Sequence, residues 1–283
     1  MKSIRKFGWS LGLLTAALIA AAPAQAANVV IAGDSWAAFQ GPEYAANFPA
    51  GVSVNQAGIA GMTASVALAT GYVNNVIALA GGANHVLISL GGNDTIAGAS
   101  AAQIDADLRG IINSVNAQFP GIQIVLPGYD FPNFEKDTEC QILGLAVFGN
   151  PLAIAVNPIF LAKVRDVQAA VAASYANVTA IDAFGTLQAA GGIPGAPNII
   201  FPSPSAYMGG NGDCIHTNST GDNIFTDKIY DLYFAAIYGP RPGGGGCAIV
   251  AAPGDDTMSA ALSSLILLVP AAAFVIVGRR RRS

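Results

Sequence analysis

The sequence predicts a three-layer α/β/α domain around a five-stranded parallel sheet. Short apolar runs that lack charged residues, as expected of strands buried on both faces, alternate with longer segments of helical period. The two strongest runs end at Gly-Gly and Pro-Gly, which suits a turn into a following helix. Because no internal repeat is visible, we interpret residues 27–240 as one domain.

Five strands and four helices account for most of this domain. We expect strands over residues 28–32, 52–55, 85–90, 122–126 and 178–181, and helices over residues 63–80, 101–118, 153–175 and 220–238. The third strand is the clearest, since it is rich in branched side chains and ends at Gly91-Gly92. In the second helix, apolar residues from Leu108 to Val115 recur at the spacing of one helix face.

Two long segments, 129–151 and 185–213, are expected to be loops. Both follow the carboxyl ends of strands, the edge at which open α/β sheets bind ligands. Long loops in a compact domain are often functional. The apolar residues of the first loop fit either an apolar ligand site or the core of the loop itself; they are Tyr129, Phe131, Phe134, Leu143, Leu145 and Phe148.

The first 26 residues have the features of a secretory signal peptide. Basic residues between Lys2 and Lys6 precede an apolar run over residues 11–22, and Ala24-Gln25-Ala26 fits the small-x-small cleavage pattern. The alternative, a permanent membrane helix, is disfavoured because about 12 apolar residues are too few to span a bilayer comfortably. We therefore expect an exported protein, periplasmic, secreted or at the cell surface.

The chain beyond residue 240 is expected to lie outside the domain. Residues 241–257 form a glycine-rich linker that contains Cys247, residues 258–278 form an uncharged transmembrane or sorting helix, and residues 279–283 form a basic cytoplasmic tail. These parts resemble bacterial tripartite C-terminal sorting signals of the CTERM kind. The resemblance implies cleavage by a sorting protease at the membrane, with Cys247 as a candidate for modification. A retained membrane anchor and a helix buried in the domain are the alternatives.

Setting the two ends aside changes the charge of the chain. Of 13 basic residues, three lie in the N-terminal segment and four in the terminal cluster, so six remain in residues 27–246 beside 15 of the 17 acidic residues. The formal net charge of this part is therefore near −9 rather than −4. So few cations make poor contacts with a phosphate backbone, and nucleic acid is not expected as a partner.

Three cysteines remain to be assigned. An exported protein can hold disulfides, and Cys140 and Cys214 both lie within the domain, whereas Cys247 lies in the linker. The simplest pairing joins Cys140 to Cys214 and leaves Cys247 for sorting or lipid chemistry. Three free thiols are the alternative, because sequence does not determine the pairing.

The domain contains two histidines, so a histidine-based site has two candidates. His85 opens the third expected strand, at the end opposite to the ligand-binding edge, and is expected to be structural. His216 lies three residues after Asp213, in a loop before the last helix. At that spacing the Asp213 carboxylate can accept from Nδ1–H and leave Nε2 free as a base, as in a Ser-His-Asp constellation.

Ser35 is the candidate nucleophile. It follows the first strand in Gly33-Asp34-Ser35-Trp36, where a tight turn into a helix would expose its hydroxyl; an ordinary N-cap serine is the alternative. Donors for a developing oxyanion can come from two further strand ends. The Asn93 side chain follows the third strand, and a glycine N–H is offered by residues 58–63 after the second.

Together these groups resemble the four sequence blocks of the GDSL/SGNH hydrolases. The matching residues, in order along the chain, are Gly33-Asp34-Ser35, Gly61, Gly91-Gly92-Asn93-Asp94, and Asp213 with His216. The resemblance spans nearly the whole domain and implies a flavodoxin-like fold. It implies Ser35 as nucleophile, His216 as base and Asp213 as its orienter. It also implies an oxyanion hole formed by the N–H groups of Ser35 and Gly61 and the Asn93 side chain, with Gly58 as the alternative to Gly61.

The activity that the resemblance implies is hydrolysis of carboxylic esters, on a small molecule or a lipid, through an acyl-enzyme on Ser35. Two positions depart from the family pattern without removing a reacting group, since Trp36 replaces the usual leucine and Thr217 a frequent proline. The alternatives are a carbohydrate O-acetylesterase or O-acyltransferase with the same triad, and a surface-displayed ligand-binding protein without turnover.

No cofactor or metal is expected. A zinc site would need more histidine or cysteine ligands than the domain offers. The alternating acids Glu135, Asp137 and Glu139 lack the spacing and the glycine of an EF-hand calcium loop, and we interpret them as a solvated charged loop. No glycine-rich phosphate loop is visible. A monomer is expected.

Overall fold

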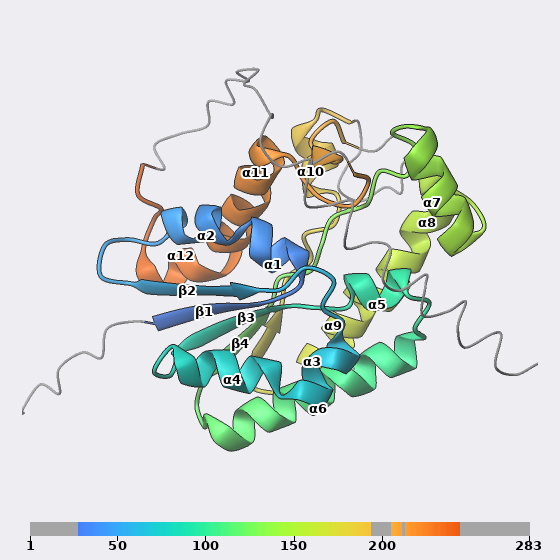
Figure 1. The fold of residues 1–283 in the computed structure, drawn as a ribbon. Coiled ribbons are helices and arrows are strands. Elements are labelled where there is room, and N and C mark those ends of the chain that lie inside the picture. Colours follow the sequence, from blue (N-terminus) through green and yellow to red (C-terminus); the bar gives the residue numbers. More distant parts are fainter. Residues whose placement is uncertain (1–27, 194–204, 211–212, 244–283) are drawn as a thin grey trace, which may run out of the picture.

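A five-stranded parallel sheet forms the middle layer of the protein (Figure 1). The computed structural model describes residues 28–193, 205–210 and 213–243. The strands are β1 (Asn28–Gly33), β2 (Ser53–Gly58), β3 (His85–Ser89), β4 (Gln123–Leu126) and β5 (Val178–Ala180), in the spatial order β2-β1-β3-β4-β5. All adjacent pairs are parallel. The predicted parallel α/β fold with flavodoxin-like strand order is therefore confirmed.

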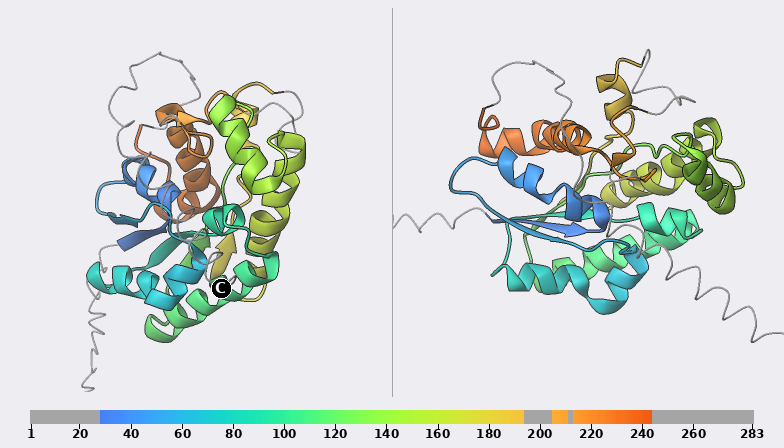
Figure 2. Two further views of the ribbon diagram at one scale, coloured as in Figure 1. Left: turned by 45° about the vertical axis from the view of Figure 1, so that its right-hand side comes forward. Right: turned by 45° about the horizontal axis from the view of Figure 1, so that its top comes forward.

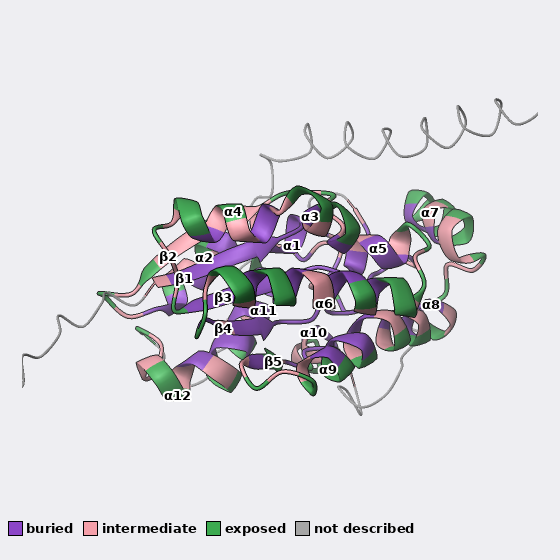
Figure 3. Ribbon diagram, turned by 90° about the horizontal axis from the view of Figure 1, so that it is seen from below, coloured by how far each residue is buried: buried purple, intermediate pink, exposed green. Residues whose placement is uncertain are grey.

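The sheet is buried on both faces because alternate residues of its strands enter two different cores. In β1, Val29 and Ile31 belong to one apolar cluster, whereas Val30 and Ala32 belong to the other. Helices complete both layers, and the central strands are buried between them (Figure 3). On one side lie α3 (Ala64–Thr70), α4 (Tyr72–Leu79), α6 (Ala101–Gln118) and α9 (Asp166–Ala172); on the other lie α1 (Ser35–Phe39), α2 (Gly41–Asn47), α11 (Ser219–Ile229) and α12 (Ala235–Tyr238).

Three predicted helices are interrupted. The first divides into α3 and α4 at Gly71, whose left-handed backbone (φ 62°) ends the first helix and begins the second. The predicted helix 153–175 becomes α8 (Ala153–Phe160), a π-helical turn η1 (Leu161–Arg165) and α9, with Pro158 in the turn before η1. The last helix likewise contains a π-helical turn, η3 (Tyr230–Phe234).

The prediction of a loop over residues 129–151 is wrong in its second half, which forms α7 (Thr138–Phe148). The nearby acids Asp137 and Glu139 are exposed to solvent and Glu135 is half-buried, and two of the three also contact backbone N–H groups. Asp137 caps α7 by accepting from the Cys140 N–H at 2.9 Å, and Glu135 accepts from the Ala153 N–H at the start of α8 at 2.6 Å. Figure 2 shows α7 and α8 beyond the carboxyl ends of the strands, beside α5 (Gly92–Ile96).

The second predicted loop contains α10 (Thr186–Ala190), and its residues 194–204 and 211–212 lie outside the described part. The expected signal peptide, Cys247, the sorting helix and the basic tail also fall outside the described residues, so they stay predictions. Within the described ranges, no single helix has the length and apolarity to cross a membrane. One pair of helical segments, α7 and Ala153–Ala172, reaches the required length and apolarity only when the two are taken together, and the pair is bent by 53°.

Candidate active site

The backbone at the end of β1 fixes the position of Ser35. Gly33 has φ +148°, and a Cβ there would lie 2.2 Å from the carbonyl oxygen of Ser89 on the neighbouring strand, so only glycine fits. Asp34 donates its N–H to that carbonyl at 3.0 Å and caps α1 by accepting from the Trp36 N–H at 2.9 Å. Ser35 is therefore the first residue of α1 rather than its N-cap, and its side chain lies at the carboxyl edge of the sheet.

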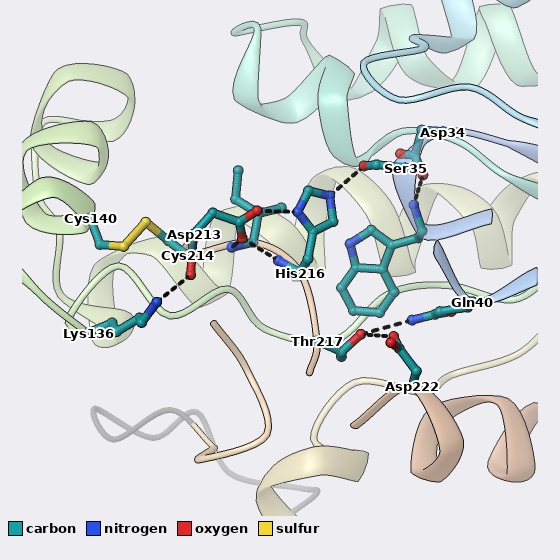
Figure 4. A network of polar contacts seen from close by, with 12 residues as sticks. Asp34, Ser35, Gln40, Lys136, Cys140, Asp213, Cys214, His216, Thr217 and Asp222 are labelled. Carbon is teal, nitrogen blue, oxygen red and sulfur yellow. Dashed lines mark hydrogen bonds and ion pairs between the residues drawn. A yellow bond between two sulfur atoms is a disulfide. The ribbon is translucent and has the colours of Figure 1, made fainter. Parts of the chain in front are cut away.

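His216 lies between Asp213 and Ser35 (Figure 4). Its Nε2 is 2.6 Å from Ser35 Oγ, and its Nδ1 is 2.5 Å from Asp213 Oδ2. The other carboxylate oxygen, Oδ1, accepts the N–H groups of Ile215 at 2.8 Å and His216 at 2.9 Å. Burial alone would raise the pKa of Asp213, but the hydrogen bond and charge of His216, with these two N–H groups, lower it overall.

The loop that carries Asp213 and His216 is anchored from several sides. Cys214 forms a disulfide with Cys140 of α7, and its carbonyl accepts the Asn133 N–H at 2.6 Å. Lys136 Nζ donates to the Asp213 carbonyl at 3.2 Å. The ring of Phe39 packs edge-on against the imidazole, with the centroids 4.8 Å apart. These contacts hold the carboxylate and the imidazole in one orientation.

Removing the disulfide should lower the stability of the protein. It joins residues 74 positions apart, so it restricts a long loop of the unfolded chain. We expect the double variant Cys140→Ala/Cys214→Ala to lose about 4 kcal/mol of unfolding free energy, measured by urea denaturation. Dithiothreitol should destabilise the wild type to the level of the variant and leave the variant unchanged. A wild type that is insensitive to reduction would contradict this.

The candidate oxyanion donors lie on neighbouring strand ends. Asn93, in the first turn of α5, donates its side-chain amide to the carbonyl of Met62 at 3.1 Å and makes a longer contact of 3.4 Å with Asp34 Oδ2. Met62 directly follows Gly61, which lies in an exposed turn with φ +79°. The alternative, Gly58, ends β2 against α1, where a Cβ would be 2.0 Å from the Ala38 nitrogen. Asn93 therefore adjoins the loop of Gly61.

Tyr129, which the sequence placed only among the apolar residues of the first loop, makes a polar contact at the site that was not predicted. It follows β4, is buried, and donates its hydroxyl to Asp34 Oδ2 at 2.6 Å. Burial raises the pKa of Asp34 to about 7, although the hydrogen bonds from Tyr129 and the Trp36 N–H and the charge of His216 counteract it. The only sequence signal for this pair is an aromatic residue at a strand end, since 95 positions separate the partners.

The raised pKa of Asp34 predicts a pH-dependent stability. The unfolded chain would ionise this carboxyl near pH 4, but the folded protein only near pH 7, so the folded state holds the extra proton between these values. Its contribution to the unfolding free energy should therefore fall as the pH rises from 4 to 7, by at most about 4 kcal/mol.

Asp34→Asn keeps the oxygen that caps α1 and should remove this part of the pH dependence. The measurement is urea denaturation at pH 4.5 and pH 8, with the exposed Asp166→Asn as the control for loss of one negative charge. If Asp34→Asn and Asp166→Asn show the same change of stability with pH, the assignment to Asp34 is wrong.

The two departures from the family pattern have structural partners. Trp36 is buried and packs edge-on against Tyr129 and Phe225, with centroid separations of 5.2 and 5.0 Å. Thr217 bonds through its hydroxyl to Asp222 and accepts from Gln40 Nε2 at 3.4 Å (Figure 4). Burial, with the nearby charge of Glu43, raises the pKa of Asp222 to about 6.

His85 lies apart from Ser35 and His216. It opens β3 at the amino end of the strand and bonds to the Tyr238 hydroxyl, 2.8 Å from its Nδ1. Burial lowers its pKa. Within the residues that the structure describes, no group of three or more histidine, cysteine or acidic side chains is placed to hold a metal ion.

The sequence was also compared with known families. A model of the GDSL-like lipase/acylhydrolase family matches residues 20–222. The chain belongs to this family. No curated protein sequence matches it significantly. Family membership makes this GDSL acylhydrolase an enzyme of the ester-hydrolysing type.

One solved structure shares the fold of this GDSL acylhydrolase, and two others match it with lower TM-scores. A Streptococcus pneumonia protein provisionally described as a platelet activating factor is 19% identical over 75% of this chain and 86% of its own, with a TM-score of 0.52. TesA is 21% identical over 72% of this chain and 96% of its own, with a TM-score of 0.47. The lipase Lip_vut3 from a goat rumen metagenome is 13% identical over 75% of this chain and 98% of its own, with a TM-score of 0.48.

Proposed function

We propose that this GDSL acylhydrolase cleaves carboxylic esters through an acyl-enzyme on Ser35. The observation that carries the proposal is the pair of short contacts on one imidazole, 2.6 Å from Nε2 to Ser35 Oγ and 2.5 Å from Nδ1 to Asp213 Oδ2. A base in contact with the hydroxyl, itself oriented by a carboxylate, is what a serine nucleophile needs for activation.

The first half-reaction transfers the acyl group to Ser35. Nε2 of His216 takes the proton of Oγ as the oxygen attacks the ester carbonyl. The low pKa of Asp213 keeps its carboxylate ionised at neutral pH, so it holds Nδ1–H and stabilises the imidazolium that forms. His216 then gives its proton to the leaving alcohol, and the ester bond breaks.

The oxyanion that develops in this step needs hydrogen-bond donors. We assign them to the N–H groups of Ser35 and Gly61 and to the Asn93 amide. One amide hydrogen of Asn93 is used by the Met62 carbonyl at 3.1 Å. The other makes only the 3.4 Å contact with Asp34, so it can turn to the oxyanion at little cost.

Water completes the cycle in the second half-reaction. His216 removes a proton from a water molecule as the water oxygen attacks the acyl-enzyme, and then returns that proton to Ser35 Oγ as the acyl–oxygen bond breaks. The net reaction converts one ester and one water into one acid and one alcohol. Ser35, His216 and Asp213 end in their starting protonation states.

We also propose that the protein works outside the cytoplasm, as a monomer, on a small-molecule or lipid ester. The signal-like residues 1–26 support export, as does the Cys140–Cys214 disulfide, since such bonds persist in oxidising compartments. Processing of the C-terminal segment by a sorting protease remains part of this proposal. Intact-mass measurement of the protein from its membrane and secreted fractions tests both processing steps, and a mass that includes residues 1–26 or 279–283 contradicts the corresponding one.

A mechanism-based label tests the proposed chemistry directly. The purified protein should hydrolyse p-nitrophenyl acetate and react with one equivalent of a fluorophosphonate, which then blocks turnover. Peptide mass mapping should place the adduct on Ser35, because only a serine activated by a base attacks this phosphorus readily. A protein that takes up no label and hydrolyses no ester would overturn the proposal.

A further inference from the structure

A small cavity adjoins Ser35 on the side of α5 and α8. Its volume is about 10 Å³, and it is lined by the proposed nucleophile, the Asn93 side chain and a set of mainly apolar groups. Ile96 comes from α5, Phe160 from the end of α8, and Ile215 from the loop before His216. Trp36 and Tyr129 form another wall. The cavity is partly open to solvent, and it places narrow, mainly apolar walls beside the point of attack.

We infer that this cavity receives the acyl part of the ester, that it is sized for an acetyl group, and that Phe160 sets the limit. The inference rests on the proposed function and names its substrate class, the acetate esters. The cavity is lined by Ser35 and Asn93 but not by the His216 side chain. An alcohol that leaves with the proton of His216 must face Nε2, so the group on the other side of the carbonyl carbon points into the cavity.

The size of the cavity allows about one methyl group. A volume of 10 Å³ is at the lower bound for holding a single water molecule, and a butyryl chain would bring two more methylenes. The walls cannot yield easily, because Phe160 is 3% exposed and packs on Phe148 with the centroids 5.8 Å apart. On the other side, the Tyr129 ring lies so close to Gly92 that a Cβ there would be 2.8 Å away.

The polar groups of the lining exclude other small acyl groups. The Asp34 carboxyl group accepts hydrogen bonds from the Tyr129 hydroxyl and the Trp36 N–H. The Asp130 carboxyl group accepts from the backbone N–H groups of Phe131, Gly185 and Leu187, at 2.7, 2.8 and 2.7 Å. Among the described residues, the lining contains no basic side chain, so the charge of a dicarboxylic half-ester such as a succinyl ester would be buried there without a partner. A short uncharged acyl group is what remains.

A series of p-nitrophenyl esters tests the inference on the intact protein. We expect kcat/KM to fall at least about 10-fold from acetate to butyrate and further to hexanoate, after subtraction of the rate of Ser35→Ala. Phe160→Ala should raise the butyrate-to-acetate ratio by about 10-fold or more, because it opens the wall. Ile154→Ala, on the exposed face of the same helix, is the matched control and should leave the ratio unchanged.

Each outcome has a distinct meaning. A wild type that prefers butyrate or hexanoate, or shows a flat profile, overturns the acetyl assignment while the fluorophosphonate label still supports the proposed function. A wild type selective for acetate whose ratio does not change in Phe160→Ala removes Phe160 from that role. If the alanine variant fails to fold, Phe160→Leu replaces it. We expect this variant to raise the butyrate-to-acetate ratio several-fold, and an unchanged ratio would again remove Phe160 from the role. Loss of all ester turnover together with loss of the label refutes the proposed function itself.

Discussion

Ser35→Ala should reduce kcat for p-nitrophenyl acetate by about 10⁵- to 10⁶-fold, the scale seen when the nucleophile of a serine hydrolase is removed. The substitution deletes the oxygen that lies 2.6 Å from His216 Nε2 and that would carry the acyl group in the proposed acyl-enzyme. KM should change little, because the cavity walls and Asn93 remain. The measurement is steady-state hydrolysis with the spontaneous rate subtracted.

The control for Ser35→Ala is a serine in another part of the fold. Ser100 caps α6 by accepting the Gln103 N–H at 3.1 Å, so Ser100→Ala should cost about 1 kcal/mol of stability and leave kcat unchanged. Circular dichroism should show that both variants are folded. Wild-type turnover in folded Ser35→Ala would mean that the short contact with His216 has no catalytic role.

Asp213→Asn should reduce kcat by about 10⁴-fold, the loss expected when the orienting carboxylate of a triad becomes an amide. The amide oxygen can still accept the N–H groups of Ile215 and His216, so the loop should keep its shape. The amide nitrogen would then donate to Nδ1 and force the imidazole proton onto Nε2. In that tautomer His216 cannot take the proton of Ser35.

The fluorophosphonate label separates this explanation from misfolding. Folded Asp213→Asn should label far more slowly than the wild type, whereas Asp182→Asn, an aspartate just after β5, should label and turn over normally. A folded Asp213→Asn variant with undiminished kcat would contradict the orienting role of the carboxylate.

The sheet and the proximity of Ser35 to Asn93 were accessible from the sequence for one physical reason. Parallel strands separated by helices place all their carboxyl ends at one edge, so residues after different strands converge without any knowledge of distances. Asp213 and His216, in contrast, were added by their spacing before the last helix and by the family resemblance. The element missed most plainly, α7, lacks a helical period. Ile142 and Leu145 are exposed while Cys140 and Gly144 are buried, so apolar residues occupy both faces and no amphipathic pattern remains.

Other features depend on tertiary contacts that have no local signal. The hydroxyl of Tyr129 contacts Asp34 only after β1 and β4 have paired with β3 in the sheet. The sequence also does not show that the N-cap of α1 is Asp34 and not the adjacent Ser35. The cavity beside Ser35 is likewise lined by Phe160 and Ile215, two residues far apart in sequence that carry no local signal of a site.

The disulfide has a consequence for proteolysis. A protease that cuts one peptide bond anywhere between Cys140 and Cys214 produces two fragments, one with Ser35 and the other with His216, but the sulfur–sulfur bond keeps them covalently attached. The nicked molecule retains both halves of its chemistry at an effectively intramolecular concentration. Under the proposed export, where foreign peptidases are present, a single cut in this segment would leave Ser35 and His216 in one covalent molecule.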